Sequence, residues 1–108
     1  MSPDERAFGA RMFAALSNPA RLHILEHLMQ GPATVNDIAR TLGLKQSITS
    51  QHLAALQAAG AVVCERRGNH RIYSLRGPRI ARILELVGEF YQAHLQNLRL
   101  LLQNSSQA

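Results

Sequence analysis

The chain has 108 residues, of which 46% are hydrophobic, and a formal net charge of +5; these values fit a single domain, spanning residues 1–108, with one modest core. No apolar run approaches the ~20 residues that cross a bilayer, and the N-terminal MSPDERAF is acidic where a secretory signal would be basic, so we expect a cytoplasmic protein without a membrane partner. The single cysteine, Cys64, excludes an intrachain disulfide and a multi-cysteine zinc cluster.

Two amphipathic helices are predicted in the first third of the chain. Ser2-Pro3 begins the first helix, with an N-cap residue followed by a proline at the first helical position. Asn18-Pro19 begins the second helix by the same device, and Gly31-Pro32 ends it. The apolar stripe of the first helix contains Phe8, Met12 and Leu16. A short helix cannot bury such a stripe by itself, so we expect it to pack on other elements.

Residues 34–60 predict two short helices joined by a tight turn, which is a helix-turn-helix. Thr34 and Asp37 have the spacing of a capping box, Gly43 ends the first helix, and Gly60 ends the second. Apolar or inward positions recur at helical spacing. They are Val35, Ile38, Ala39, Leu42, Thr49, Leu53 and Leu56.

A polar face remains at the start of the second of these helices. In helix-turn-helix proteins this end enters the major groove, where glutamine can bond adenine, serine either partner, and lysine a guanine or a phosphate. The alternative is an ordinary helical hairpin with a solvated face. The candidate base-reading residues are Lys45, Gln46, Ser47, Ser50 and Gln51.

Residues 61–75 predict a β-hairpin with a cationic tip. Gly68-Asn69 suits a two-residue turn, and that register sets Cys64 opposite Tyr73. The segment from Glu65 to Arg82 contains six arginines and one acid, a concentration typical of contact with a phosphate backbone, although a solvated basic loop is the alternative. We interpret the hairpin as a wing whose DNA-contacting residues are Arg66, Arg67, His70 and Arg71.

The last helix is predicted from Gly77-Pro78 to about Gln103, followed by a frayed tail. Its apolar residues alternate in steps of four and three, which is a heptad seam, and the stripe is wider than one small domain can cover. We therefore expect a twofold dimer through the first and last helices (1–16 and 78–103); the alternative is a long helix packed wholly within its own subunit. The candidate interface residues are Phe8, Met12, Leu84, Val87, Tyr91, His94 and Leu98.

The chain resembles the ArsR family of bacterial winged-helix repressors over nearly its whole length. The matching stretches are ALSNPARLHIL (15–25), VNDIARTLGLKQSITSQHLAALQAAGAV (35–62) and RRGNHRIYSL (66–75). The resemblance implies a mainly α fold with a small β-hairpin, a winged helix-turn-helix with four helices, two strands and a last helix, which dimerises through its terminal helices. Relatives often carry a valine where this chain has Thr49, and Ile48 is then expected to seal the domain edge or to touch a thymine methyl group.

The sensing motifs of the family are not recognisable in this sequence. The Cys-Val-Cys positions hold Thr34-Val35-Asn36, and the last helix has one histidine, His94, and no aspartate. No metal site and no cofactor are therefore predicted. A small-molecule effector is a further expected partner, with a space lined by Phe8, Met12, Phe90 and Tyr91 as its candidate site.

Three other groups remain as alternative sensors. His23 and His27 stand four residues apart on the second helix, where they are close enough to share one metal or form a solvated surface pair. His94 can meet its symmetry mate or simply set the helix register. Cys64 is either a small buried hydrophobe or an oxidisable thiol.

The sequence thus predicts a homodimeric transcriptional regulator that binds double-stranded DNA at an inverted-repeat operator and represses. An activator or anti-repressor of the same fold, or a dimeric protein-interaction module, is the alternative. An enzyme is not expected, because no phosphate loop, nucleophile motif or carboxylate pair occurs in the sequence.

Overall fold

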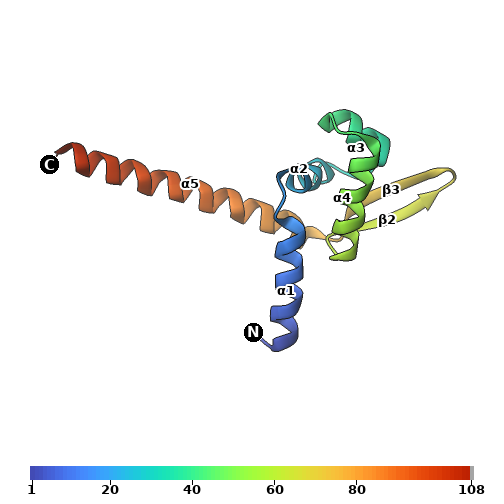
Figure 1. Ribbon diagram of the computed structural model, residues 1–108, viewed down its shortest axis with the longest axis horizontal. Helices are drawn as coiled ribbons and strands as arrows, with labels where there is room; N and C mark the ends of the chain where they lie inside the picture. The colour runs from blue at the N-terminus through green and yellow to red at the C-terminus, as the bar shows by residue number, and fades with distance from the viewer. Residues whose placement is uncertain (108) are drawn as a thin grey trace.

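The computed structural model describes the backbone of residues 1–107 and the side chains of residues 1–105. Helices α1 and α2 are followed by a helix-turn-helix (α3 and α4), a β-hairpin (β2 and β3) and a long helix α5 (Figure 1). The bounds are α1 Pro3–Leu16, α2 Pro19–Leu28, β1 Ala33–Thr34, α3 Val35–Leu42, α4 Gln46–Ala58, β2 Val62–Arg67, β3 His70–Leu75 and α5 Pro78–Gln107. The predicted winged helix-turn-helix is confirmed.

One strand was not predicted. β1 has only two residues and pairs antiparallel with β3, so the sheet has the order β1-β3-β2. Ala33 lies opposite Tyr73 and Thr34 opposite Ile72. Two residues are too few to show an alternating pattern, and the strand is recognised only by its pairing with the free edge of β3.

The first three helices begin where the capping residues predicted. The side-chain oxygens of Ser2 and Thr34 accept the backbone N–H groups three residues on, at 3.1 and 3.2 Å. Asn18 accepts two N–H groups, from Ala20 at 2.8 Å and Arg21 at 3.2 Å. Each such cap stabilises its helix by roughly 1 kcal/mol.

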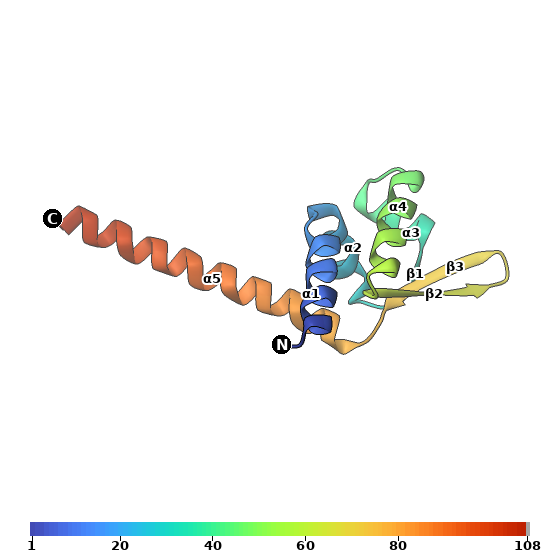
Figure 2. The same ribbon diagram turned by 60° about the horizontal axis from the view of Figure 1, so that its bottom comes forward.

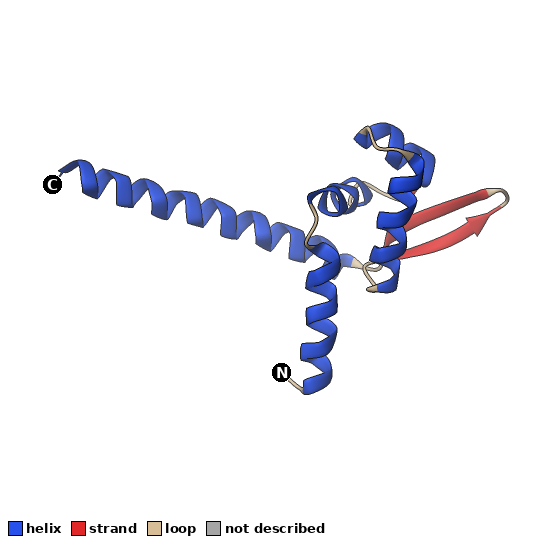
Figure 3. Cartoon of the chain, viewed as in Figure 1, coloured by secondary structure: helices blue, strands red, loops and turns tan. Residues whose placement is uncertain are grey.

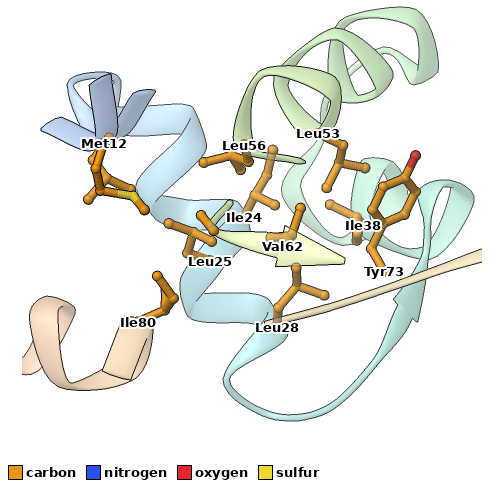
Figure 4. Packing of buried hydrophobic residues seen from close by; sticks show 12 residues of the cluster. Met12, Ile24, Leu25, Leu28, Ile38, Leu53, Leu56, Val62, Tyr73 and Ile80 are labelled. Carbon is orange, nitrogen blue, oxygen red and sulfur yellow. The ribbon is translucent and has the colours of Figure 1, made fainter. Parts of the chain in front are cut away.

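The core forms where α1, α2, α3, α4 and the base of the hairpin meet (Figure 4). The side chains of Ile24, Leu25, Ile38, Leu53 and Leu56 are fully buried there. Only the first turns of α5 reach this core, through Ile80 and the half-buried Ile83 and Leu84. The core therefore holds the helix-turn-helix in place. The part of α5 that follows Leu84 does not pack against this core.

The hairpin has the predicted register. Arg67 pairs with His70, Arg66 with Arg71, and Cys64 with Tyr73. Gly68 has φ +61°, as the first position of a tight two-residue hairpin turn requires. The hairpin projects beyond the helices, as the red strands in Figure 3 show.

Helix α5 leaves the body of the domain and extends well away from it (Figures 1 and 2). It continues to Gln107, so the prediction that it ends near Gln103 in a frayed tail was wrong for the described residues; Ala108 lies outside them. The idea that α5 packs wholly within its own subunit is also wrong, since Val87, Phe90, Tyr91 and Leu98 are exposed. In the described chain, no helix is long and apolar enough to span a membrane.

Candidate nucleic-acid interface

The start of α4 presents polar side chains to solvent. Its inner face is held by Thr49, Leu53 and Leu56, which are completely buried, and the Thr49 hydroxyl donates to the Lys45 carbonyl at 2.9 Å. Thr49 is thus a satisfied core residue. The five residues predicted to read bases are all exposed on the opposite side. They are Lys45, Gln46, Ser47, Ser50 and Gln51.

The N-terminus of α4 differs from those of α1, α2 and α3. Lys45 is its N-cap residue, and in the described chain no side chain caps this end. The first N–H groups of α4 are therefore available to an anion, and the positive end of the helix dipole favours one. An uncapped, lysine-flanked helix start suits a DNA phosphate.

A groove of about 400 Å³ separates α4 from β3 and the N-terminus of α3. Gln46 and Ser50 line its α4 side, and His70 and Arg71 line its wing side. Residues that were predicted independently from a helix and from a hairpin therefore face one common concave surface. Ser47 and Gln51 are exposed on α4 but do not line this groove.

Further polar residues line the same groove and were missed by sequence reasoning. Gln57 continues the Gln46–Ser50 face of α4 at helical spacing, so the periodicity could have identified it. Asn36 of α3 and Asn69 of the hairpin turn also line it. Only the fold brings these two asparagines beside α4, and no local pattern in the sequence indicated that.

The two faces of the wing carry different charges. Because residues directly opposite in a hairpin share a face, Arg66 and Arg71 continue the face of Cys64 and Tyr73, and of these two arginines Arg71 lines the α4 groove. Arg67 lies on the other face, where its Nε is 3.3 Å from a carboxylate oxygen of Glu65. Like charges directly opposite destabilise a hairpin, so the Arg66–Arg71 pair favours an anion between or beside them.

Tyr73 forms the floor of the groove where the wing joins the domain. Its side chain is buried, and this burial raises the pKa of the phenol above its usual value of 10.0. A hydrogen bond with Cys64 raises the pKa further, while Arg71 acts in the opposite direction. The phenol therefore stays neutral at physiological pH and leaves the groove with a positive wall.

Arg21 connects the back of α4 to the rest of the domain. Its Nε donates to His52 Nδ1 at 3.2 Å, and its Nη1 donates to the Ala15 carbonyl at the end of α1, also at 3.2 Å. Ile48, on the same side of α4, is 38% exposed. Ile48 is thus an exposed apolar residue at the edge of the domain.

None of the alternative sensors forms a recognisable metal centre. Within the described residues, no group of three histidine, cysteine, aspartate or glutamate side chains could hold a metal ion. His23 and His27 line a shallow surface pocket with Glu26, Cys64 is half-buried at the wing base, and His94 is exposed on α5.

The candidate effector space is arranged differently from the prediction. Phe8 and Met12 do line a cavity between α1 and α5, but their partners are Ile80 and Ile83 of the first turns of α5. Phe90 and Tyr91 lie further along the exposed part of α5 and do not line it. Phe90 and Tyr91 lie about two helical turns beyond Ile83, the last α5 residue that lines the cavity.

Comparisons with known proteins agree on one family. The family described as "Bacterial regulatory protein, arsR family" matches residues 18–62. The HTH-type transcriptional regulator NmtR of Mycobacterium tuberculosis is 40% identical over 76 residues, a match that spans 70% of this chain and 63% of NmtR. The HTH-type transcriptional regulator CmtR of Mycobacterium bovis is 37% identical over 86 residues, covering 80% of this chain and 70% of CmtR.

A solved structure extends the agreement to the fold. The solution structure of a homodimeric winged helix-turn-helix DNA-binding domain from Mycobacterium bovis superposes with a TM-score of 0.78 at 35% identity, covering 88% of this chain and 91% of that domain. These relatives are regulators and not enzymes. From its sequence, its fold and these matches, the chain belongs to the ArsR family of winged helix-turn-helix transcriptional regulators.

Proposed function

We propose that the chain binds an inverted-repeat operator as a homodimer and represses transcription from the cytoplasm by covering the promoter. The N-terminal half of α4 enters the major groove and reads bases, while the wing grips phosphate or the adjacent minor groove. The observation that carries this proposal is the shared groove in which Gln46 and Ser50 of α4 face His70 and Arg71 of the wing.

The dimer is proposed from the exposed apolar surface of α5. Tyr91 is 57% exposed and Leu98 43% exposed, and a surface of this kind marks an interaction site when it is continuous. Phe8, Val87 and His94 extend it. Met12 is only 8% exposed and Leu84 is half-buried, so these two offer a partner less surface than the others.

The polar side of α5 supports the same arrangement. Arg82 bonds Glu85 at 3.2 Å and Glu89 at 3.3 Å, so a charged ladder follows the helix away from the apolar stripe. A twofold partner on the stripe would leave this ladder in water. The homodimeric state of the similar Mycobacterium bovis domain is consistent with that partner being a second copy.

The proposal is tested by competition between DNA duplexes. Genomic fragments are first selected by the purified protein, and the affinity for the selected duplex is then compared with that for random DNA at fixed salt. We expect a preference of about a thousandfold or more, with half-sites centred about one helical turn apart. Equal affinity for both duplexes contradicts the proposal and favours the protein-interaction module.

The reading residues are tested by substitution. Gln46→Ala or Ser50→Ala should relax the preference at particular base positions, because each good base contact contributes about 1–3 kcal/mol of discrimination. Gln30→Ala is the matched control, since Gln30 is exposed at the end of α2, outside the groove. An unchanged operator profile for both α4 variants would remove these residues from the reading face.

Regulation by a metal of the cysteine or Asp/His type is not part of the proposal, because the positions of those motifs hold other residues. Whether the bound protein represses or activates is decided by reporter expression with and without the gene. Higher expression without the gene supports repression, and lower expression supports the activator alternative.

A further inference from the structure

The cavity between α1 and α5 is lined mainly by apolar residues. It measures about 330 Å³ and is bounded by α1, by the first turns of α5 and by the two loops that connect α4 to β2 and β3 to α5. This volume is at the lower end of the range for small-molecule sites. Its lining residues that matter here are Phe8, Met12, Gly60, Arg76, Arg79 and Ile83.

Two cations stand at the rim of this apolar space. Arg76 and Arg79 both line the cavity and are both exposed to solvent. Among the described residues, ion pairs are formed by Arg40, Arg67 and Arg82, and not by Arg76 or Arg79. The first turn of α5 also contains no acidic residue, so the positive end of its helix dipole is not offset locally.

The cavity wall contains both connections between the wing and the rest of the chain. Gly60 (φ +84°) stands between α4 and β2, and Gly77 (φ +141°) between β3 and α5. The backbone N–H of Arg76 donates to the Ala61 carbonyl at 3.1 Å. The side chain of Arg76 also approaches Gly60, because its Nη1 lies 3.7 Å from the position that a Cβ on Gly60 would occupy. A molecule in this cavity would therefore contact both connecting loops at the same time.

We propose that this cavity binds a small carboxylate-bearing apolar molecule, whose acid group meets Arg76 and Arg79 and whose body lies on Phe8, Met12 and Ile83. Occupancy changes the angle between the wing and the α1–α5 dimer helices, and thereby operator affinity. The binding step stands alone, whereas this regulatory step rests on the proposed function.

Binding is tested on the full chain without DNA, with octanoate as the probe and octanol as its uncharged counterpart. Calorimetry should give saturable binding of one octanoate per chain, about tenfold or more tighter than octanol, because charge-assisted hydrogen bonds are the stronger ones. In amide NMR spectra the largest shifts should fall at Gly60 and Gly77. Equal affinities, no saturation, or shifts confined to the exposed stripe of α5 would overturn the site.

Variants separate the site from general charge effects. The double variant Arg76→Gln/Arg79→Gln should lose the preference for octanoate over octanol, and Arg99→Gln, far along the same helix, should keep it. Ile83→Phe should fill the cavity and weaken both ligands, with thermal unfolding as the check that the chain is folded. Equal losses in the double variant and in Arg99→Gln contradict the proposal.

The regulatory step is tested by operator titration at saturating octanoate. A change of about tenfold in affinity for the wild-type protein, absent in the double variant, supports it. If octanoate binds and operator affinity does not change, the regulatory step is wrong although the site stands. If the double variant binds octanoate normally but loses affinity for all DNA, the two arginines are phosphate contacts and the site is wrong. If the wild-type chain binds no specific DNA, the proposed function fails while the calorimetric result remains.

Discussion

Arg21 is a side chain that joins α4 to the end of α1. Its guanidinium donates to His52 of α4 and to the Ala15 carbonyl at the end of α1, so any shift of α1 relative to α2 reaches the back of α4. The bond between Arg21 and His52 joins residues 31 positions apart in sequence. We therefore infer that Arg21 positions α4 for the proposed base reading, although it does not lie in the groove.

Replacing Arg21 by methionine tests this role, because methionine keeps the aliphatic length and removes the donors. We expect a loss of about 1–3 kcal/mol in the free energy of unfolding, since part-buried acceptors lose their partner, and weaker operator binding. Urea unfolding and DNA titration measure the two effects. Arg11→Met, on the exposed side of α1, is the control and should change neither.

A double-mutant cycle with His52→Phe shows whether the contact itself is responsible. A coupling energy of about 0.5–3 kcal/mol is expected for residues in direct contact. Additive losses would mean that Arg21 acts through Ala15 alone.

Single residues differ in how far the sequence could predict them. The caps at Ser2, Asn18 and Thr34 and the inward position of Thr49 follow from patterns a few residues long, and the structure has each of them. The Arg21–His52 bond spans 31 positions, and no local pattern announces it. Such contacts depend on how the helices cross.

The wing is the element whose two faces the structure distinguishes. Its register could be predicted because the turn fixes which residues are opposite, and the structure has the same pairs. From the sequence alone, the four candidate DNA-contacting residues of the hairpin could not be distinguished. Alternation along the strands separates Arg66 and Arg71, which share one face, from Arg67, which pairs with Glu65 on the other.

This difference predicts unequal effects of two similar substitutions. Arg71→Gln should weaken binding to all duplexes and reduce the salt dependence by about one phosphate contact. Arg67→Gln should have a smaller effect, because Glu65 already offsets the charge of Arg67. Affinity measured between low and moderate salt gives both slopes. The assignment of faces is wrong if Arg67→Gln has the larger effect.

The whole molecule is longer than its core requires. Its extents are 66 × 38 × 22 Å, and the long axis is set by α5, which leaves the body after its first turns (Figure 2). The heptad pattern could predict that this helix seeks a partner, but not where it leaves the domain, because that point depends on the packing of Ile80, Ile83 and Leu84 against the core. We therefore propose that the exposed stripe beyond them forms the dimer contact.

Leu98→Glu tests the dimer in the distal half of α5, away from the domain core, so the fold itself should survive. A charge buried in a helix seam is costly, and we expect monomers in sedimentation experiments at concentrations where the wild type is a dimer. Gln96→Glu adds the same charge on the polar side of α5 and should remain dimeric. Since each monomer retains one α4 and one wing, the Leu98→Glu variant should still bind a half-site weakly and should lose the preference for an inverted repeat. A dimer of undiminished stability would show that the distal part of α5 lies outside the interface, and would confine the contact to the first helix and the first turns of α5.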